Sequence, residues 1–521
     1  MAEKTNINQT NRTIENTSSI KFRNLVAKNA IDHLFADNQI FFFAAKAGIT
    51  GSSGSSSESS FTDELTYENI TVLERVTSKD VSLVVPRINY QSGIVYNPFN
   101  PYKNNYAYVV DIRGNITYNF KPYVMTSNYN VYVCIKNCQS GLNRDRVAST
   151  IEPTGIGTRP FTTADGYMWQ YICSISDEYF GFLTEKWMPV PKRILTKPTT
   201  GLNSAKYRQY QVQLAADTTK GSIKDLDINI GNKNVYFDSE PTLTIIGQGF
   251  SASASIGTAY DSSKGYKLTG YNISNGGNGY VGGSVKLNIS PNNNSDITSK
   301  TELESLITPQ TSFGGSDLDI GSDPTIALQA RTLMFVGSMS QSDGSIGSFP
   351  EGIVMGSFGL ISNPIYATGP NKGSIVGDEL GRGADTKLNI RQAVKVQIKD
   401  NSGAGFTLTT AKTVGDPRLP LNSKVQFSQS DTEASVIDLR PYNFSGPGSS
   451  IRSNLFITGQ KTSPVAGDIV TGSGSPAATF EVEQVFESLV QVGSGNLLYI
   501  IPNLFNILKE QQYIVRFIIP L

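Results

Sequence analysis

One short stretch, residues 150–175, constrains the fold of this chain more than any other. It reads TIEPTGIGTRPFTTADGYMWQYICSI and contains two turn signals. Pro153 fixes its own φ and moves the preceding glutamate out of the helical region, while Gly155 can take a positive φ. The pair Asp165–Gly166 is the second signal, because aspartate and glycine both favour turns. An extended segment bounded by two turns is therefore expected here.

The residues that follow these turns predict a strand. Large side chains occupy every second position of residues 167–174, which places Tyr167, Trp169, Tyr171 and Cys173 on one face. A period of two with aromatic residues on one side is typical of a strand with a heavy core face. We expect the first two hundred residues to pack around this strand.

Two internal repeats appear further along the chain, each at a spacing of 44 residues. Tyr236, Leu243 and Ile245 correspond to Tyr280, Leu287 and Ile289. Later, Val425, Ala434 and Val436 correspond to Ile469, Ala478 and Phe480. Short strands with frequent turn signals indicate small β-modules, and two copies are too few for a solenoid. Each set is expected to form its own local cluster.

These patterns predict a mainly β fold with a few helices, in which a β-sandwich-like core is interrupted by two small all-β modules. The 25 Phe and 24 Tyr among 521 residues are typical of a globular chain. The expected segments are 1–18 (polar arm), 19–200 (core), 201–300 (first module), 301–380 (core), 381–488 (second module) and 489–521 (core strands).

Charge and hydropathy argue against two classes of partner. The 44 basic and 44 acidic side chains cancel, which removes the long-range attraction that nucleic-acid binders use. No run of eighteen apolar residues exists, so we expect no membrane span.

The polar start of the chain lacks an apolar signal segment, and its three cysteines form no disulfide framework. Synthesis in a reducing cytoplasm is therefore expected.

No set of residues predicts a catalytic, cofactor or metal site. The single histidine, His33, falls on a predicted helix and has no reason to face a cleft. A zinc site from His33, Cys134, Cys138 and Cys173 is an alternative, and the spacing of Cys134 and Cys138 is acceptable for it. However, Cys134 and Cys173 fall in predicted strands, and the sequence has no second pair of closely spaced cysteines. We expect the cysteines to be small buried apolar residues.

Two further patterns are better explained as turns than as a catalytic pair or a phosphate-binding loop. Glu152 and Asp165 could form a glycosidase pair, but an aspartate before a glycine more often bonds backbone amides in a turn. The glycines of residues 276–279 precede neither Lys-Ser nor a predicted helix, so they indicate a β-turn and not a phosphate loop. The chain is therefore not expected to be an enzyme.

Five motifs, in this order, resemble a family of phage proteins. They are Lys21-Phe22-Arg23 before the strand Ile40-Phe41-Phe42; Pro86-Arg87 with Tyr90 and Gly93; Glu152-Pro153-x-Gly155 with Asp165-Gly166-Tyr167-x-Trp169; Asn363-Pro364; and Gly495–Tyr499 with the strand Tyr513–Ile519. The chain thereby resembles gene product eight, the baseplate wedge protein of T-even-like contractile-tailed phages. The resemblance covers residues 19–197, part of 333–366, and 494–521, and it skips both inserted modules.

The resemblance implies a structural protein of the virion, located in the tail baseplate and assembled in the host cytoplasm. It implies a homodimer in each wedge, contacts to other baseplate wedge proteins, and a part in the rearrangement that triggers sheath contraction. A rival hypothesis is a tail-associated adhesion module, in which the β-insertions bind a receptor or glycan. Insertions packed against neighbouring subunits would favour the scaffold, and displayed aromatic clusters would favour adhesion.

Overall fold

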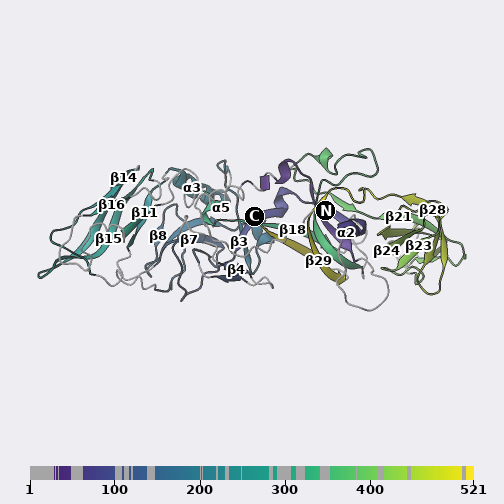
Figure 1. The fold of residues 1–521 in the computed structure, drawn as a ribbon, viewed down its shortest axis with the longest axis horizontal. Coiled ribbons are helices and arrows are strands. Elements are labelled where there is room, and N and C mark those ends of the chain that lie inside the picture. The colour runs from purple at the N-terminus through teal and green to yellow at the C-terminus, as the bar shows by residue number, and fades with distance from the viewer. Residues whose placement is uncertain are drawn as a thin grey trace, which may run out of the picture. The chain divides into compact units, whose positions relative to one another are not determined.

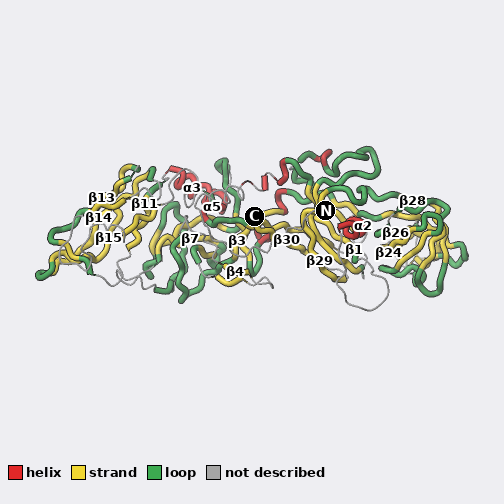
Figure 2. The backbone as a smooth tube through the Cα atoms, viewed as in Figure 1, coloured by secondary structure: helices red, strands yellow, loops and turns green. Residues whose placement is uncertain are grey.

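The fold is described from a computed structural model. It describes residues 29, 31–32, 34–47, 63–99, 108–110, 116–118, 121–137, 147–199, 201, 203–218, 221–228, 234–247, 249–280, 286–289, 307–311, 323–340, 353–382, 384–408, 416–442, 448–460, 462–506 and 512–521. The motif Lys21-Phe22-Arg23, His33, Cys138 and the start of the first predicted helix lie outside these residues. Strands predominate, so the mainly β class is confirmed (Figure 2).

The chain divides into two compact units. Unit 1 comprises residues 1–29, 82–334 and 519–521, and unit 2 comprises residues 30–81 and 335–518. The segment expected as the first module thus falls in unit 1, and the segment expected as the second module falls in unit 2. Residues 19–200 are shared between the units, and the expected domain limits stay a prediction. None of the described helices is long and apolar enough to cross a membrane.

The aromatic strand predicted from the sequence is β9 (Met168–Ser174), in a four-stranded sheet of unit 1. The strand order is β6–β7–β9–β8, with β6 at Tyr123–Met125, β7 at Asn130–Lys136 and β8 at Phe161–Thr162. Trp169 and Tyr171 are completely buried, and Trp169 lies opposite Cys134 of β7. Cys134 and Cys173 are buried, as expected.

Strand β9 is buried on both faces. Gln170 and Ile172, on the other face, are also buried, because helix α3 (Ala205–Thr218) and the short helix α5 (Pro324–Ala327) contact the strand. No apolar stripe in the sequence predicts α3, since the buried side of this helix includes glutamines. Gln209 is one of them, and its Nε2 donates to the Lys192 carbonyl at 2.8 Å.

The remaining strands of unit 1 pair antiparallel. Strand β3 (Val81–Pro86) pairs with β10 (Trp187–Val190). Small separate sheets are formed by β4 (Tyr108–Val110) with β5 (Ile116–Tyr118), by β11 (Ile223–Ile228) with β17 (Ile307–Thr311), by β12 (Tyr236–Phe237) and β14 (Phe250–Asp261) on either side of β15 (Gly265–Asn278), and by β13 (Leu243–Ile246) with β16 (Lys286–Ile289). A 3₁₀ helix, η2, spans Asp177–Phe182. In the last sheet Leu243 lies opposite Ile289 and Ile245 opposite Leu287, which confirms the expected local pairing of the first repeat.

A five-stranded antiparallel sheet forms one part of unit 2. Its order is β20–β2–β1–β19–β29, with β20 at Asn389–Arg391, β2 at Ile70–Arg75, β1 at Ile40–Lys46, β19 at Val354–Ser362 and β29 at Asn496–Asn506. Phe41 and Phe43 belong to one apolar cluster, whereas Phe42 stacks on Phe358. The adjoining elements are α2 (Asp63–Asn69), η1 (Ser78–Asp80) and η3 (Asp378–Leu380). The boundary between the units falls within β18 (Thr332–Ser340) and β30 (Gln512–Pro520).

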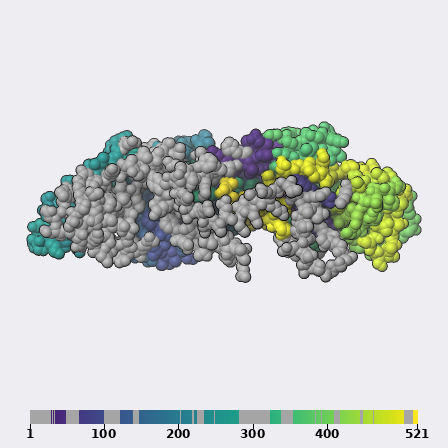
Figure 3. Space-filling view, viewed as in Figure 1, coloured from purple at the N-terminus to yellow at the C-terminus, as the bar shows by residue number. Residues whose placement is uncertain are grey.

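The other part of unit 2 is a closed six-stranded barrel, which contains the second repeat (Figure 1). Its strands follow the order β21 (Val394–Asp400), β26 (Arg452–Thr458), β24 (Thr432–Pro441), β23 (Lys424–Phe427), β27 (Ile469–Gly472) and β28 (Thr479–Phe486). A further pair, β22 (Phe406–Leu408) and β25 (Gly448–Ser450), lies outside this order. In the space-filling view the green to yellow residues of the barrel form one block (Figure 3).

The barrel has its own apolar core, which includes every side chain expected from the second repeat except Ile469; Ala434 is buried in it and Ala478 packs against it. Val425, Val436 and Phe480 are buried in one cluster, whereas Ile469 is not part of it. Val470 takes that place and is completely buried. Val470 replaces Ile469 in the core because side chains alternate between the two faces of a strand, so that a shift of one residue reverses the face.

Candidate functional site

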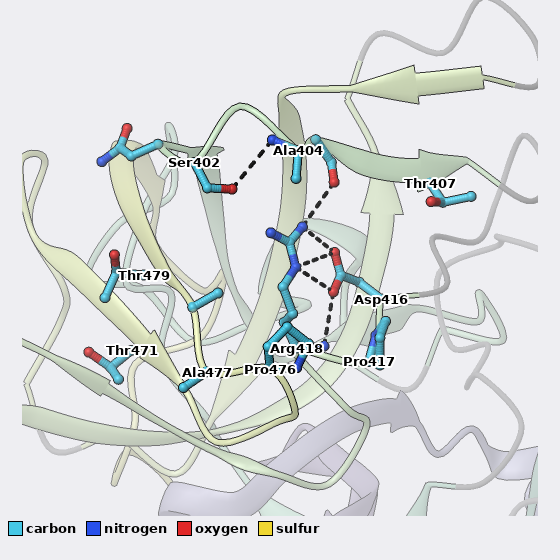
Figure 4. Close-up of a pocket in the computed structure, with 13 residues that line it drawn as sticks. Ser402, Ala404, Thr407, Asp416, Pro417, Arg418, Thr471, Pro476, Ala477 and Thr479 are labelled. Carbon is cyan, nitrogen blue, oxygen red and sulfur yellow. Dashed lines mark hydrogen bonds and ion pairs between the residues drawn. The ribbon is translucent and has the colours of Figure 1, made fainter.

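The candidate site is a cavity of about 840 Å³ at one end of the barrel. Three segments line it: the turn after β21, the turn before β23, and the β27–β28 hairpin. Thr471 and Thr479 come from the hairpin, and Ser402 comes from the turn after β21 (Figure 4). The wall also contains Arg418, whose guanidinium points into the turn region in the close-up.

Arg418 is the centre of a buried ion network. Its guanidinium donates to Asp416 through Nε at 2.9 Å and Nη2 at 2.7 Å, and to Asp400 through Nη1 at 2.7 Å. Nη2 also donates to the Gly405 carbonyl at 2.9 Å. The side chains of Arg418, Asp400 and Asp416 are 10%, 0% and 4% exposed. Paired, charge-assisted bonds of this kind are strong and directional.

Two aromatic rings lie beside the same guanidinium. Its central carbon lies 5.0 Å from the ring centroid of Phe480 and 5.5 Å from that of Phe406. The two rings stack on each other at 5.3 Å. Cation–π attraction adds to the ion pairs, and it is stronger where water is excluded. Arg418 therefore connects the turns to the barrel core through Phe480.

Asp400 organises the turn after β21. Its carboxylate accepts hydrogen bonds from the Ser402 amide at 2.9 Å and the Ser402 hydroxyl at 2.6 Å, and from the Gly405 amide at 2.9 Å. Burial raises the pKa of Asp400, but these bonds and Arg418 outweigh it and lower the pKa to about 2. The hydrogen bond to Asp416 raises the pKa of Arg418 above its ordinary value. Asp400 and Arg418 stay charged at ordinary pH, so their ion pair is suited to holding turns and not to transferring protons.

The motif around Asp165 performs the same task in unit 1. Asp165 accepts bonds from the Ser149 hydroxyl at 2.8 Å and from the amides of Thr150 at 2.9 Å and Ile151 at 3.0 Å. Partial burial raises its pKa, and bonds from Thr163, Ser149 and these amides outweigh that effect, so the pKa lies below its usual value. The prediction that Asp165 is a turn former is confirmed.

The neighbouring motif residues also hold backbone and rings. Glu152 accepts bonds from the Ser127 amide at 2.9 Å and the Ser127 hydroxyl at 3.3 Å. Pro153 is buried, and Gly166 takes a φ of 83° in its turn. Gly155 lies so close to Phe161 that a Cβ at this position would be only 2.9 Å from the ring. The ring of Tyr167 stacks on that of Trp169, with the ring centroids 5.7 Å apart.

Two further motifs form hydrogen bonds at the ends of strands. Pro86 ends β3, where its carbonyl accepts a bond from the Tyr123 hydroxyl at 2.7 Å, and the Arg87 Nη1 donates to the Thr184 carbonyl at 2.9 Å. Asn363, which precedes Pro364, has a φ of 53° at the end of β19, and its Oδ1 accepts a bond from the Gln39 amide at 2.8 Å.

The structure thus brings together the motif residues of 152–169 in unit 1 and places Asn363–Pro364 in unit 2. The Arg418 network is not among the sites expected from the sequence. Its signals are visible only in retrospect: Asp416-Pro-Arg418, and the turn-rich run of residues 400–405. Among the described residues, no three His, Cys, Asp or Glu side chains gather as a metal site would require. A scan against models of known protein families finds none that matches this chain, and a search of curated proteins finds no match either.

Proposed function

We propose that this chain is a structural subunit of the baseplate wedge of a contractile phage tail. In this proposal it is a dimeric scaffold that docks neighbouring wedge proteins and takes part in the rearrangement that triggers sheath contraction. The observation that carries the proposal is the role of the motif residues. Those that the structure describes, such as Asp165 and Asn363, bond to backbone and hold turns and strand ends.

The charged network of the barrel supports the same role. Arg418 and its two carboxylates are bonded to one another and to turn backbone. Groups committed in this way stabilise a fixed surface, which a scaffold requires because interfaces depend on shape complementarity. Large apolar side chains are available for such an interface on β29 and β30, where Leu498 is 49% exposed and Ile514 is 52% exposed.

The direct test is a cryo-EM map of the tail of the phage that encodes this chain. We expect density for the barrel and for the β9 sheet in the baseplate, with two copies per wedge. A tail whose baseplate contains no such density, in particles that an antibody to the chain fails to label, would refute the proposal.

Self-association can be tested on the purified chain by light scattering. We expect a dimer that Leu498→Asp weakens, because burying an unpaired charge in an interface is costly. Leu195→Asp is the matched control, since Leu195 is 85% exposed and lies in unit 1. A monomeric wild-type chain would contradict the dimer.

A second candidate function is adhesion through the inserted modules. The observation that favours it is a cavity in unit 1 whose wall includes β15, within the segment expected as the first module.

A further inference from the structure

A second cavity, of about 700 Å³, lies within unit 1. One side is formed by Lys136 at the end of β7 and Met168 at the start of β9, together with the loop of residues 158–160. The opposite side is formed by residues 271–277 of β15, and Ala215 of α3 and the start of β11 complete the wall. Its volume falls in the range of small-molecule sites, which is about 300–1,000 Å³.

The wall of this cavity is basic. Lys136 and Arg159 both line it, and none of the described residues that line it is an aspartate or a glutamate. Arg159 is exposed, and no described carboxylate forms an ion pair with it. Two cations in a concave site focus positive potential, so an anion is attracted there even though the whole chain has no net charge.

Lys136 is held in place by an aromatic ring. Its ammonium lies 4.4 Å from the ring centroid of Tyr271 and also donates to the Tyr271 hydroxyl. This cation–π contact fixes the position of the charge at the wall. The bond to the Tyr271 hydroxyl holds the ammonium at the hydroxyl end of this ring.

The other polar groups of the wall are neutral hydroxyls and amides. They belong to Thr158, Ser222, Tyr271, Asn272, Ser274 and Asn275. Hydroxyls and amides can both donate and accept hydrogen bonds, which suits a ligand that has many hydroxyl groups of its own. The wall therefore combines a charge for an anion with neutral partners for a sugar.

The wall on the β15 side is closely built. A Cβ at Gly276 would lie 2.3 Å from the Ser222 Oγ and 2.4 Å from the Ile223 carbonyl oxygen, so only glycine permits this approach to β11. The Asn275 Oδ1 accepts a bond from the Gly277 amide at 3.0 Å, and Gly277 has a φ of 61°. A site with fixed walls loses less conformational entropy when it binds a ligand.

We propose that this cavity binds an acidic saccharide, meaning a sugar that carries a carboxylate or a phosphate. The anion lies between Lys136 and Arg159, and the sugar hydroxyls bond to the serine, threonine and asparagine side chains of the wall. This site is independent of the baseplate proposal, since a scaffold subunit need not bind a sugar and a sugar-binding chain need not be a scaffold.

Isothermal titration calorimetry on the full-length chain tests this proposal with four probes: glucuronic acid, glucose 6-phosphate, glucose and inorganic phosphate. We expect both acidic sugars to bind about tenfold or more tightly than glucose and than phosphate, because charge-assisted and neutral bonds act together. Raising the salt concentration should weaken the binding of the acidic sugars.

Three variants locate the site. Lys136→Met and Arg159→Ala should each weaken binding of the acidic sugars about tenfold. Asn275→Asp keeps the acceptor for the Gly277 amide and introduces a negative charge, so it should weaken binding while the fold is retained, which circular dichroism would verify. Lys372→Met is the matched control, since Lys372 is exposed and lies in unit 2.

Four outcomes would overturn the proposal. They are equal affinity for glucose and glucuronic acid, binding of phosphate as tight as that of glucose 6-phosphate, no binding of either acidic sugar, and unchanged affinity in a folded Asn275→Asp variant. None of these outcomes bears on the position of the chain in a tail, which the cryo-EM map tests separately.

Discussion

The two repeats of the chain share a spacing in sequence but differ in how they are completed in the structure. In both, a strand pairs antiparallel with its own copy: β13 with β16 in unit 1, and β23 with β27 in the barrel. In each repeat the two copies therefore pair directly with each other.

The surroundings of the two repeats differ strongly. The barrel closes around side chains that are almost completely buried, including Val425, Phe427 and Phe480. The sheets of the first repeat remain open, with Phe250 63% exposed and Tyr260 70% exposed on β14. β14 reads FSASASIGTAYD, and its small residues supply little apolar area to bury. A shared repeat thus specifies pairing, whereas closure depends on the size of the side chains between the strands.

The largest expected effect comes from removing a core ring of the barrel. Phe480→Ala should lower the free energy of unfolding of the barrel by about 3–5 kcal/mol, as deletion of a large buried side chain does. The equivalent truncation in the first repeat, Ile245→Ala, should cost only about 1 kcal/mol because Ile245 is half-buried. Pulse proteolysis in urea, with fragments mapped by mass spectrometry, would report each region separately. Equal losses would remove the distinction between a closed and an open repeat.

The next effect concerns the ion network that closes the barrel end. Arg418→Met leaves two buried carboxylates without their cation, which should cost about 3 kcal/mol. Arg452→Met is the control, since Arg452 is 40% exposed and an exposed ion pair such as Arg452–Glu483 contributes little to stability. The same urea series measures both variants. Similar losses for both would show that Arg418 acts as an ordinary surface cation.

A smaller effect should appear in acid. The pKa of Asp400 is about 2 in the folded chain and about 4 in an unfolded one, so its stabilising contribution is complete above pH 4 and is lost as the pH falls toward 2. The urea midpoint of the barrel should therefore fall between pH 4 and pH 2. Asp400→Asn should flatten this part of the profile, whereas Asp261→Asn, at the tip of the β14–β15 hairpin, should not. An unchanged slope in Asp400→Asn would contradict the assignment.

The sequence predicts those parts of the fold that depend on local alternation. β9 and its aromatic residues follow from the period of two, and Asp165 follows from its place before a glycine. The pairing of the first repeat also follows, because Leu243 and Ile245 have equally apolar counterparts. These signals are local, and tertiary contacts reinforce them.

Other features depend on contacts that no local pattern reveals. The second face of β9 is buried by α3, whose inward side carries Gln209 and Gln213, so the helix lacks an apolar stripe. The exchange of Ile469 for Val470 is a shift of one residue that a spacing of 44 cannot resolve. The partners of Arg418 are brought together by the closure of the barrel, and the cavity beside Lys136 joins segments more than a hundred residues apart.

Native-state hydrogen exchange with mass spectrometry tests most directly whether one repeat is closed and the other open. Amides of β23 and β27 should exchange roughly a hundredfold more slowly than those of β13 and β16, because exchange in the barrel requires its core to open. The Phe480→Ala variant should accelerate exchange in the barrel alone. Equal exchange rates in the two strand pairs, or faster exchange in the barrel, would contradict the account.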